Sequence, residues 1–473
     1  MHLRFPLALS LAAVFALWST AEAAKAKHHA KPHWHYEIQI NGIAPAPFDA
    51  LRSDWVQEGP KGLEARAVVA QAACPEISVD GHDWIMDQRA ASDDKFAMLC
   101  SAIIPAGSKQ AALVFRQRPT SPAGTAQLVQ NLERALAEFH GDLRIVPLPL
   151  PPTDPQRIVV FGDTGCRIKG KELQACNDPE KWPFATIAAE AAKLKPDLVI
   201  HVGDYLYREN ACPADYPGCQ GTPWGDNWKT WDADFFTPAK PLLAAAPWVF
   251  VRGNHEDCER AGLGWLKLLG PLAFDPAAPC MAHLAPYSIP LAAMNLVVID
   301  DVTALEKDVV TDMVPVFRSE IRTLDQQPSP SWLLLHRPIW AAISGPLGIP
   351  IGGSQTMIAA ATNGIPSPVT LMLAGHIHTF EAINYGPSPH VPPQVVAGFG
   401  GDNLDPTPLD LKGTIFQGAS GVTVRDGVSI RGFGFLLMTK RGDDWIIEVH
   451  DVHGAIERQC LFHSGRVDCP SGN

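Results

Sequence analysis

Short, mostly apolar runs recur between residues 157 and 373, and this recurrence restricts the possible folds more than any other feature. Each run has four or five residues, as strands that are buried on both faces do. Segments with helical character, such as Pro183–Leu194, lie between several of the runs. The alternation predicts an α/β core. Its strands would be Arg157–Phe161, Leu198–Val202, Trp248–Val251, Leu296–Ile299, Trp332–Leu335 and Val369–Leu373.

Residues that are able to bind metal ions follow five of these runs. In an open α/β sheet, ligands bind beyond the carboxyl ends of the strands, so we expect these residues to line one crevice. Glycines precede most of them, and a glycine lets the backbone turn sharply and approach a site closely. The motifs are Gly162-Asp163-Thr164-Gly165, Gly203-Asp204-Tyr205-Leu206-Tyr207, Gly253-Asn254-His255-Glu256, His336 and Gly375-His376-Ile377-His378.

The number of donor side chains predicts two metal ions rather than one. A single Gly-Asp pair is a common turn, and a single histidine is commonly structural, but the ordered set of motifs indicates a dinuclear site. Two ions about 3.5–4 Å apart that share one carboxylate would use all seven donors. His376 and His378 would point to one face of an extended segment, so each can serve a different ion. The donors are Asp163, Asp204, Tyr207, Asn254, His336, His376 and His378.

The order of these motifs resembles that of the purple acid phosphatases, within the calcineurin-like metallophosphoesterase superfamily. The resemblance covers about Arg157 to Gly401. It implies an α/β fold in which two packed mixed β-sheets are flanked by helices, with a small β-rich N-terminal domain.

The same resemblance implies a role for each donor. Asp163, Tyr207 and His378 correspond to ligands of an Fe(III) ion. Asn254, His336 and His376 correspond to ligands of a second, divalent ion, which would be iron, zinc or manganese. Asp204 would bridge the two ions, and His255 would lie beside the substrate phosphate.

Two local differences from the family pattern concern substrate recognition. Phe380 stands in the Gly375–Glu381 stretch where the family has tyrosine, and no histidine pair follows His336 as it does in plant members. Arg167, Arg252 and Arg337 lie next to predicted ligands, where phosphate binding and a packing role are both open. Trp224, Trp228 and Trp231 lie in an expanded loop after Tyr207 and would either line the pocket or pack the loop.

The predicted activity is that of a metal-dependent phosphoric ester hydrolase of the acid phosphatase type. A hydroxide that bridges the ions would attack the phosphorus of a small phosphate monoester, and His255 would protonate the leaving alkoxide. Two alternatives remain open. The first is a phosphodiesterase or nucleotidase on the same core. The second is a catalytically degenerate, metal-containing binding protein.

Three parts are predicted along the chain. Residues 1–23 are a signal peptide, with one basic residue, an apolar stretch and the Ala21-Glu22-Ala23 cleavage site. Residues 24–150 are a β-rich domain with a helix over 122–140 and a stiff linker from Val146 to Pro152. Residues 151–473 are the metallophosphoesterase domain. Its segment from Val422 to Val449 is predicted to be antiparallel, with turns at Asp426-Gly427 and at Arg441–Asp443.

Charge and cysteine content indicate an exported protein that does not bind nucleic acid. The net charge is −12, whereas nucleic-acid binders need a basic surface. Ten cysteines lie after the signal peptide, and sequential disulfides would staple local loops in an oxidising compartment, periplasmic or extracellular. No membrane span is predicted after cleavage, and the oligomeric state stays open. The expected pairs are Cys74/Cys100, Cys166/Cys176, Cys212/Cys219, Cys258/Cys280 and Cys460/Cys469.

Overall fold

The computed structural model describes residues 50–70, 73–116, 143–345, 350–387, 389–408, 410–416 and 422–470. The predicted signal peptide and the predicted helix over 122–140 lie outside these residues.

Eleven strands form the first sheet, and three of the predicted strands lie side by side in it. β9, β12 and β13 run parallel, so their carboxyl ends lie at the same edge. In spatial order the strands are β26 (Arg466–Asp468), β25 (Ile456–His463), β24 (Asp444–Asp451), β23 (Gly434–Arg441), β9 (Arg157–Phe161), β12 (Leu198–His201), β13 (Trp248–Phe250), β1 (Leu51–Gly59), β2 (Gly62–Val69), β6 (Met98–Ile103) and β5 (Asp87–Ala90).

Seven strands form the second sheet, which contains the other three predicted strands. β15, β16, β19 and β21 run parallel there, and the remaining strands are antiparallel to their neighbours. In spatial order the strands are β14 (Tyr287–Pro290), β15 (Asn295–Val298), β16 (Ser331–Leu334), β19 (Val369–Ala374), β21 (Gln394–Ala397), β20 (Phe380–Tyr385) and β22 (Val424–Ile430).

The two sheets pack face to face over one buried apolar core. Alternate side chains of β9 and β12, such as Val160 and Ile200, meet side chains of β16 and β19, such as Leu334 and Leu373. Burial on the other face explains why these strands are apolar throughout rather than alternating.

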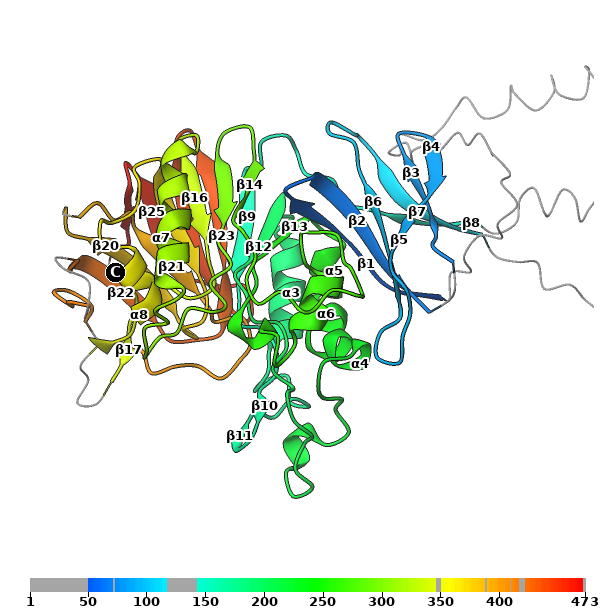
Figure 1. Cartoon of the computed structure of the whole chain (residues 1–473), viewed down its shortest axis with the longest axis horizontal. Coiled ribbons are helices and arrows are strands. Elements are labelled where there is room, and N and C mark those ends of the chain that lie inside the picture. Colours follow the sequence, from blue (N-terminus) through cyan, green and yellow to red (C-terminus); the bar gives the residue numbers. More distant parts are fainter. Residues whose placement is uncertain are drawn as a thin grey trace, which may run out of the picture.

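Helices cover the outer faces of both sheets (Figure 1). α3 (Phe184–Lys193), α5 (Thr237–Leu243) and α6 (Gly262–Leu268) pack on the first sheet, and α7 (Val314–Thr323) and α8 (Gln355–Ala360) pack on the second. In α3 the buried side chains are Phe184, Ile187, Ala188 and Ala191, the spacing of one helix face. The predicted helix Pro183–Leu194 and the predicted α/β core of two mixed sheets are therefore confirmed.

The β-rich N-terminal part is a sandwich whose first layer continues the eleven-stranded sheet. Its second layer is β4 (His82–Ile85), β3 (Glu76–Val79), β7 (Ala111–Arg116) and β8 (Leu143–Pro147). Parallel pairing of β1 with β13 joins this part to the core, and β8 includes the first two residues of the predicted linker. Arg66 also reaches across to the end of α6 and donates to the carbonyl oxygens of Leu268 at 2.6 Å and Gly270 at 2.8 Å.

The segment after Val422 differs in one respect from the sequence prediction. Asp426-Gly427 does not form a turn, because both residues lie within β22 and pair with Asn384 and Ile383 of β20. The chain instead leaves the second sheet after Ile430 and enters the first sheet at β23. The predicted turn at Arg441–Asp443 is correct, since Gly442 has a φ of 64° between β23 and β24.

Five disulfides join the cysteines in the predicted sequential pairs. Two of them staple neighbouring loops in the lobe that projects below the body in Figure 1. In the part of the chain that the structure describes, no helix has the length and apolar character to cross a membrane. The shorter elements are β10 (Ile168–Lys169), β11 (Glu172–Leu173), η2 (Pro217–Cys219), α4 (Trp228–Trp231), η3 (Asp232–Phe236), η4 (Asn254–Glu256), η5 (Leu324–Gln326), β17 (Ile343–Ser344) and β18 (Pro350–Ile351).

Candidate metal centre

The predicted donors come from the carboxyl ends of strands in both sheets. Asp163, Asp204 and Asn254 follow β9, β12 and β13 of the first sheet. His336 follows β16 of the second sheet, and His376 and His378 follow β19. Because the two sheets pack face to face, these ends meet at one edge of the molecule.

Three of the donors have a backbone conformation that non-glycine residues rarely adopt. The φ angles of Asp163, Asp204 and His376 are 58°, 58° and 68°. Each such residue costs roughly 1 kcal/mol or more and persists only where the surrounding structure holds it. The His376-Ile377-His378 segment is therefore bent rather than extended, contrary to the prediction. It bends because the amide of His376 donates to Asp163 Oδ2 at 2.9 Å.

The glycines before the donors allow neighbouring motifs to touch. A side chain at Gly203 would overlap the ring of His336, and one at Gly253 would overlap Asp204. A Cβ atom at Gly375 would lie 2.5 Å from Asp163 Oδ2. These three motifs thus start with glycine because another motif occupies the space of its side chain.

The hydroxyl of Tyr207 lies at the centre of the first group of donors. Its oxygen is 3.0 Å from Asp163 Oδ1, 2.9 Å from Asp204 Oδ2 and 3.1 Å from His378 Nε2. Asp234, in the π-helix η3, holds this turn by accepting from the backbone amide of Tyr207 at 2.9 Å. A single phenol proton therefore faces three possible acceptors.

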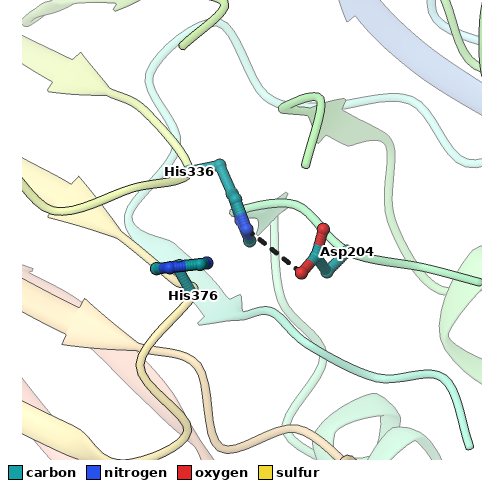
Figure 2. A group of neighbouring side chains, drawn as sticks. All are labelled: Asp204, His336 and His376. Carbon is teal, nitrogen blue, oxygen red and sulfur yellow. Dashed lines mark ion pairs between the residues drawn. The ribbon is translucent and has the colours of Figure 1, made fainter. Parts of the chain in front are cut away.

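The second group of donors surrounds His336. Its Nε2 lies 3.1 Å from Asp204 Oδ2 and 3.0 Å from Asn254 Oδ1. One donor atom from each of Asp204, His336 and His376 lies within 4.8 Å of the others. Figure 2 shows His336 pointing at Asp204, with His376 beside it.

Backbone carbonyls determine which ring nitrogen faces the donors. His336 Nδ1 lies 2.8 Å from the carbonyl oxygen of Val202, and His378 Nδ1 lies 2.7 Å from that of Asn403. A carbonyl only accepts, so both Nδ1 atoms carry a proton. The Nε2 atoms then direct lone pairs toward the carboxylates, as metal-bound histidines with fixed tautomers do.

This excess of acceptors fits metal ions. In the metal-free protein, protons must lie between these acceptors in place of the ions. Burial lowers the pKa of His336, but the charge of Asp204 outweighs burial and raises that pKa to about 9. Burial lowers the pKa of His378 as well, but the Asp402 charge and a hydrogen bond that Asp163 accepts from the imidazole raise that pKa to about 10. A cation bound among these atoms would satisfy the lone pairs without protons.

His255 lies beside both groups and has an acidic partner that sequence reasoning missed. Its amide donates to Asp204 Oδ1 at 2.8 Å, and its ring lies 3.9 Å from the Tyr207 ring. Its Nδ1 lies 2.6 Å from Glu209 Oε1. Burial lowers the pKa of His255 to about 4, although Asp204 and Glu209 act in the opposite direction. The only sequence signal for Glu209 is an acidic residue shortly after Tyr207.

Glu256 ties together the two turns that present Asp204 and Asn254. Its carboxylate accepts from the amides of Tyr205 at 2.9 Å, Leu206 at 3.1 Å and Gly253 at 3.2 Å. Burial and then the Asp204 charge raise the pKa of Glu256 to about 8. Its role is structural, and sequence reasoning did not assign it.

The three arginines beside the donors are held by the protein itself. Arg167 contacts Asp402 and pairs with Glu172 at 2.8 Å. Arg252 donates to the carbonyl oxygens of Glu256 and Met281, each at 2.8 Å, and lies 3.2 Å from Asp300. Arg337 donates to the carbonyl oxygen of Val302 at 2.7 Å and contacts Glu306.

The tryptophans of the expanded loop have different environments. Trp231 is fully buried against Phe235 and Phe236, and Trp228 is partly buried beside them. Trp224 is 54% exposed, so it contributes little to packing. Two of the three therefore pack the loop on the core.

Comparison with known proteins identifies the fold. Residues 156–380 match the family described as calcineurin-like phosphoesterase. The structure of purple acid phosphatase PPD1 from seeds of yellow lupin (Lupinus luteus) is similar, with 13% identity, a TM-score of 0.51, and coverage of 90% of this chain and 77% of the lupin chain. The structure of PhoD is similar too, with 11% identity, a TM-score of 0.50, and coverage of 91% of this chain and 94% of PhoD.

At such identities the two structures establish the fold alone, and no curated protein matches this chain in sequence. The family match covers all of the predicted donors, from Asp163 to His378. The family is one of metal-dependent phosphoric ester hydrolases. The chain therefore contains a calcineurin-like phosphoesterase domain, in a fold that it shares with purple acid phosphatase.

Proposed function

We propose that the chain is an exported, dinuclear phosphoesterase that hydrolyses small phosphate monoesters. One observation carries the proposal: a single oxygen, Asp204 Oδ2, lies 2.9 Å from the Tyr207 hydroxyl and 3.1 Å from His336 Nε2. A carboxylate oxygen between two groups of donors is the arrangement that a bridging ligand needs.

The seven donors divide into two sets around Asp204. Asp163, Tyr207 and His378 would hold a first ion, and the hard, anionic phenolate oxygen favours Fe(III) there. Asn254, His336 and His376 would hold a divalent ion, which would be iron, zinc or manganese. Bound ions supply positive charge that neutralises the phosphoryl oxygens and acidifies water.

In this proposal His255 protonates the leaving alkoxide, a role that its pKa of about 4 favours at acidic pH. Its Nδ1 faces Glu209, so its Nε2 is the nitrogen that faces the donors, 3.9 Å from Asp204 Oδ2. Glu209 orients the ring and favours its protonated form, because a nearby carboxylate stabilises imidazolium. Arg260, 3.5 Å from Glu209, holds that carboxylate in turn.

Phosphodiesters are the second candidate substrates, and one observation favours them. A monoester dianion needs more positive charge than a diester monoanion. Among the described residues beside the donors, Arg167, Arg252 and Arg337 are all held by protein carboxylates or carbonyls. No histidine pair follows His336 either. Charge compensation for a dianion would therefore come from the ions and from protonated His255, without a free arginine among the described residues beside the donors.

A single assay series tests these alternatives. The protein is stripped with a chelator, refilled with iron and zinc, and given p-nitrophenyl phosphate or its bis-ester. Faster metal-dependent hydrolysis of the monoester supports the first proposal, and faster hydrolysis of the bis-ester supports the second. Two bound ions with no hydrolysis of either ester would indicate a catalytically degenerate binding protein.

Export is part of the proposal, with the periplasm or the extracellular space as the destination. The five disulfides support it, because such bonds persist in oxidising compartments. The predicted mature N-terminus is Ala24. Mass spectrometry of the protein from an exporting host tests both points, and a reduced, uncleaved, active protein would contradict them.

A further inference from the structure

The loop that follows β15 contributes no predicted donor, yet it contacts both histidines of the second group. Asp301 accepts from the backbone amide of His336 at 3.2 Å and from that of Arg337 at 2.8 Å. Asp301 is fully buried, so these contacts fix the backbone from which the His336 ring projects.

Arg337 links this loop to His376. Its side chain is almost fully buried and donates to the carbonyl oxygens of Asp301 at 3.1 Å and Val302 at 2.7 Å. Its Nε contacts Glu306 Oε1, and the same oxygen lies 2.8 Å from His376 Nε2. Glu306 is thus held in place by a rigid arginine and faces the histidine.

This contact assigns the nitrogens of His376. A carboxylate paired with Arg337 is ionised and only accepts, so His376 Nε2 carries the proton that faces it. The lone pair then lies on Nδ1, which has no hydrogen-bond partner among the described residues. His336 and His376 would thus present opposite nitrogens, since a carbonyl holds Nδ1 of His336 and a carboxylate holds Nε2 of His376.

We propose that Glu306 is a positioning residue that holds His376 so that its Nδ1 ligates the second ion. The inference rests on the proposed dinuclear site. Carboxylates that accept from the second nitrogen of a metal-bound histidine fix its tautomer and orientation, and their loss costs about 10–100-fold in metal affinity. Glu306 is not itself a ligand in this scheme.

The test compares two substitutions at Glu306 with a matched control. Glu306→Ala removes the acceptor, and Glu306→Gln keeps an amide oxygen in its place. The control is Glu320→Gln, because Glu320 of α7 lies 2.7 Å from Nε2 of His283 in a similar carboxylate–histidine pair away from the donors. Zinc binding to the stripped full-length proteins is measured by equilibrium dialysis with metal analysis, and nitrogen NMR of the histidines reports the tautomer of His376.

We expect Glu306→Ala to lower the affinity for one of the two ions about 10–100-fold and to leave the affinity for the other unchanged. The metal affinity of Glu306→Gln should fall between those of Glu306→Ala and the wild type, and the affinity of Glu320→Gln should match that of the wild type. His376 should carry its proton on Nε2 in the wild type and as a mixture in Glu306→Ala.

Three results would overturn the inference. The first is wild-type affinity for both ions in Glu306→Ala, and the second is an equal loss of affinity at both sites. The third is an equal loss of affinity in Glu306→Gln and Glu306→Ala, which would make Glu306 a direct ligand. A wild-type protein that binds one ion would instead overturn the dinuclear proposal, so the two failures are distinguishable. The wild-type NMR spectrum tests the His376 tautomer even if a variant fails to fold.

Discussion

Asp204 Oδ2 lies 3.1 Å from His336 Nε2, although the two residues follow strands of different sheets. Asp204 follows β12 of the first sheet, and His336 follows β16 of the second. The candidate metal centre therefore spans both sheets, and it forms only when their packed faces are in register. A bound ion would link the sheets and stabilise the fold.

We expect Asp204→Asn to reduce hydrolysis at least about 100-fold, because the substitution removes the one charge that both groups of donors share. Loss of this carboxylate should also release at least one ion. Steady-state kinetics and metal analysis of the same preparation measure both effects. Near-normal turnover with two ions retained would contradict the bridging role.

His255→Ala should slow hydrolysis of alkyl phosphates by about 100-fold or more and spare aryl phosphates, since a good leaving group needs no proton. Metal content should stay at the wild-type value. Equal losses on both kinds of ester would mean that His255 binds substrate rather than donating a proton.

Glu209→Gln tests the role of His255 without removing its ring. Glu209 raises the pKa of His255 against the stronger effect of burial, so its neutralisation should lower that pKa further. The general acid would then lose its proton at lower pH, and the basic limb of the kcat/KM profile should move toward acid. An unshifted pH profile of kcat/KM would show that Glu209 does not affect the proton donor.

Tyr207→Phe should abolish colour while the fold remains. A phenolate bound to Fe(III) absorbs visible light, and the phenylalanine ring keeps the contact with His255, whose ring lies 3.9 Å away. Visible absorption and thermal unfolding are measured together. A colourless wild type that is fully active with zinc or manganese in both positions would exclude iron.

After metal removal, the stability of the protein should fall as the pH rises into the alkaline range. The pKa values of His336 and His378 in the metal-free fold, about 9 and about 10, exceed the roughly 6.5 of an unfolded histidine. The stabilisation from these protons is complete below about pH 6.5 and is lost as the pH rises through 9 and 10. In the loaded protein the proposed ions would replace these protons.

The difference in Tm between loaded and stripped protein should therefore widen from pH 6.5 to pH 10. Differential scanning calorimetry at matched ionic strength measures it. A constant difference over this range would show that the two histidines do not hold extra protons in the stripped protein.

Arg66→Ala should destabilise the protein by about 3–5 kcal/mol, because Arg66 is fully buried and pairs with Glu64 at 2.7 Å. Its loss also leaves the carbonyl oxygens of Leu268 and Gly270 without this donor. Urea unfolding measures the change. Arg458→Ala, which removes an exposed bond to the carbonyl oxygen of Pro470, is the control and should cost under about 1 kcal/mol.

Sequence alone predicted the strands and the donor motifs, because both depend on local chemistry. A run such as Arg157–Phe161 is apolar whatever lies around it, and its strand has those same bounds. Cysteines close in sequence also pair most easily, since short loops close at little entropic cost. The sequential disulfides follow from that.

Only the tertiary structure decided the surroundings of the donors. Glu209 and Glu306 act on His255 and His376 from loops 46 and 70 residues away in sequence, and nothing local marks an acidic residue as the partner of a distant ring. The same applies to Asp426-Gly427, a pair typical of turns, which lies within β22 because β20 offers it a full set of pairing partners. Local patterns determine which residues have the right chemistry. Packing of the two sheets determines which of them meet, because that depends on side chains brought together only after the chain has folded.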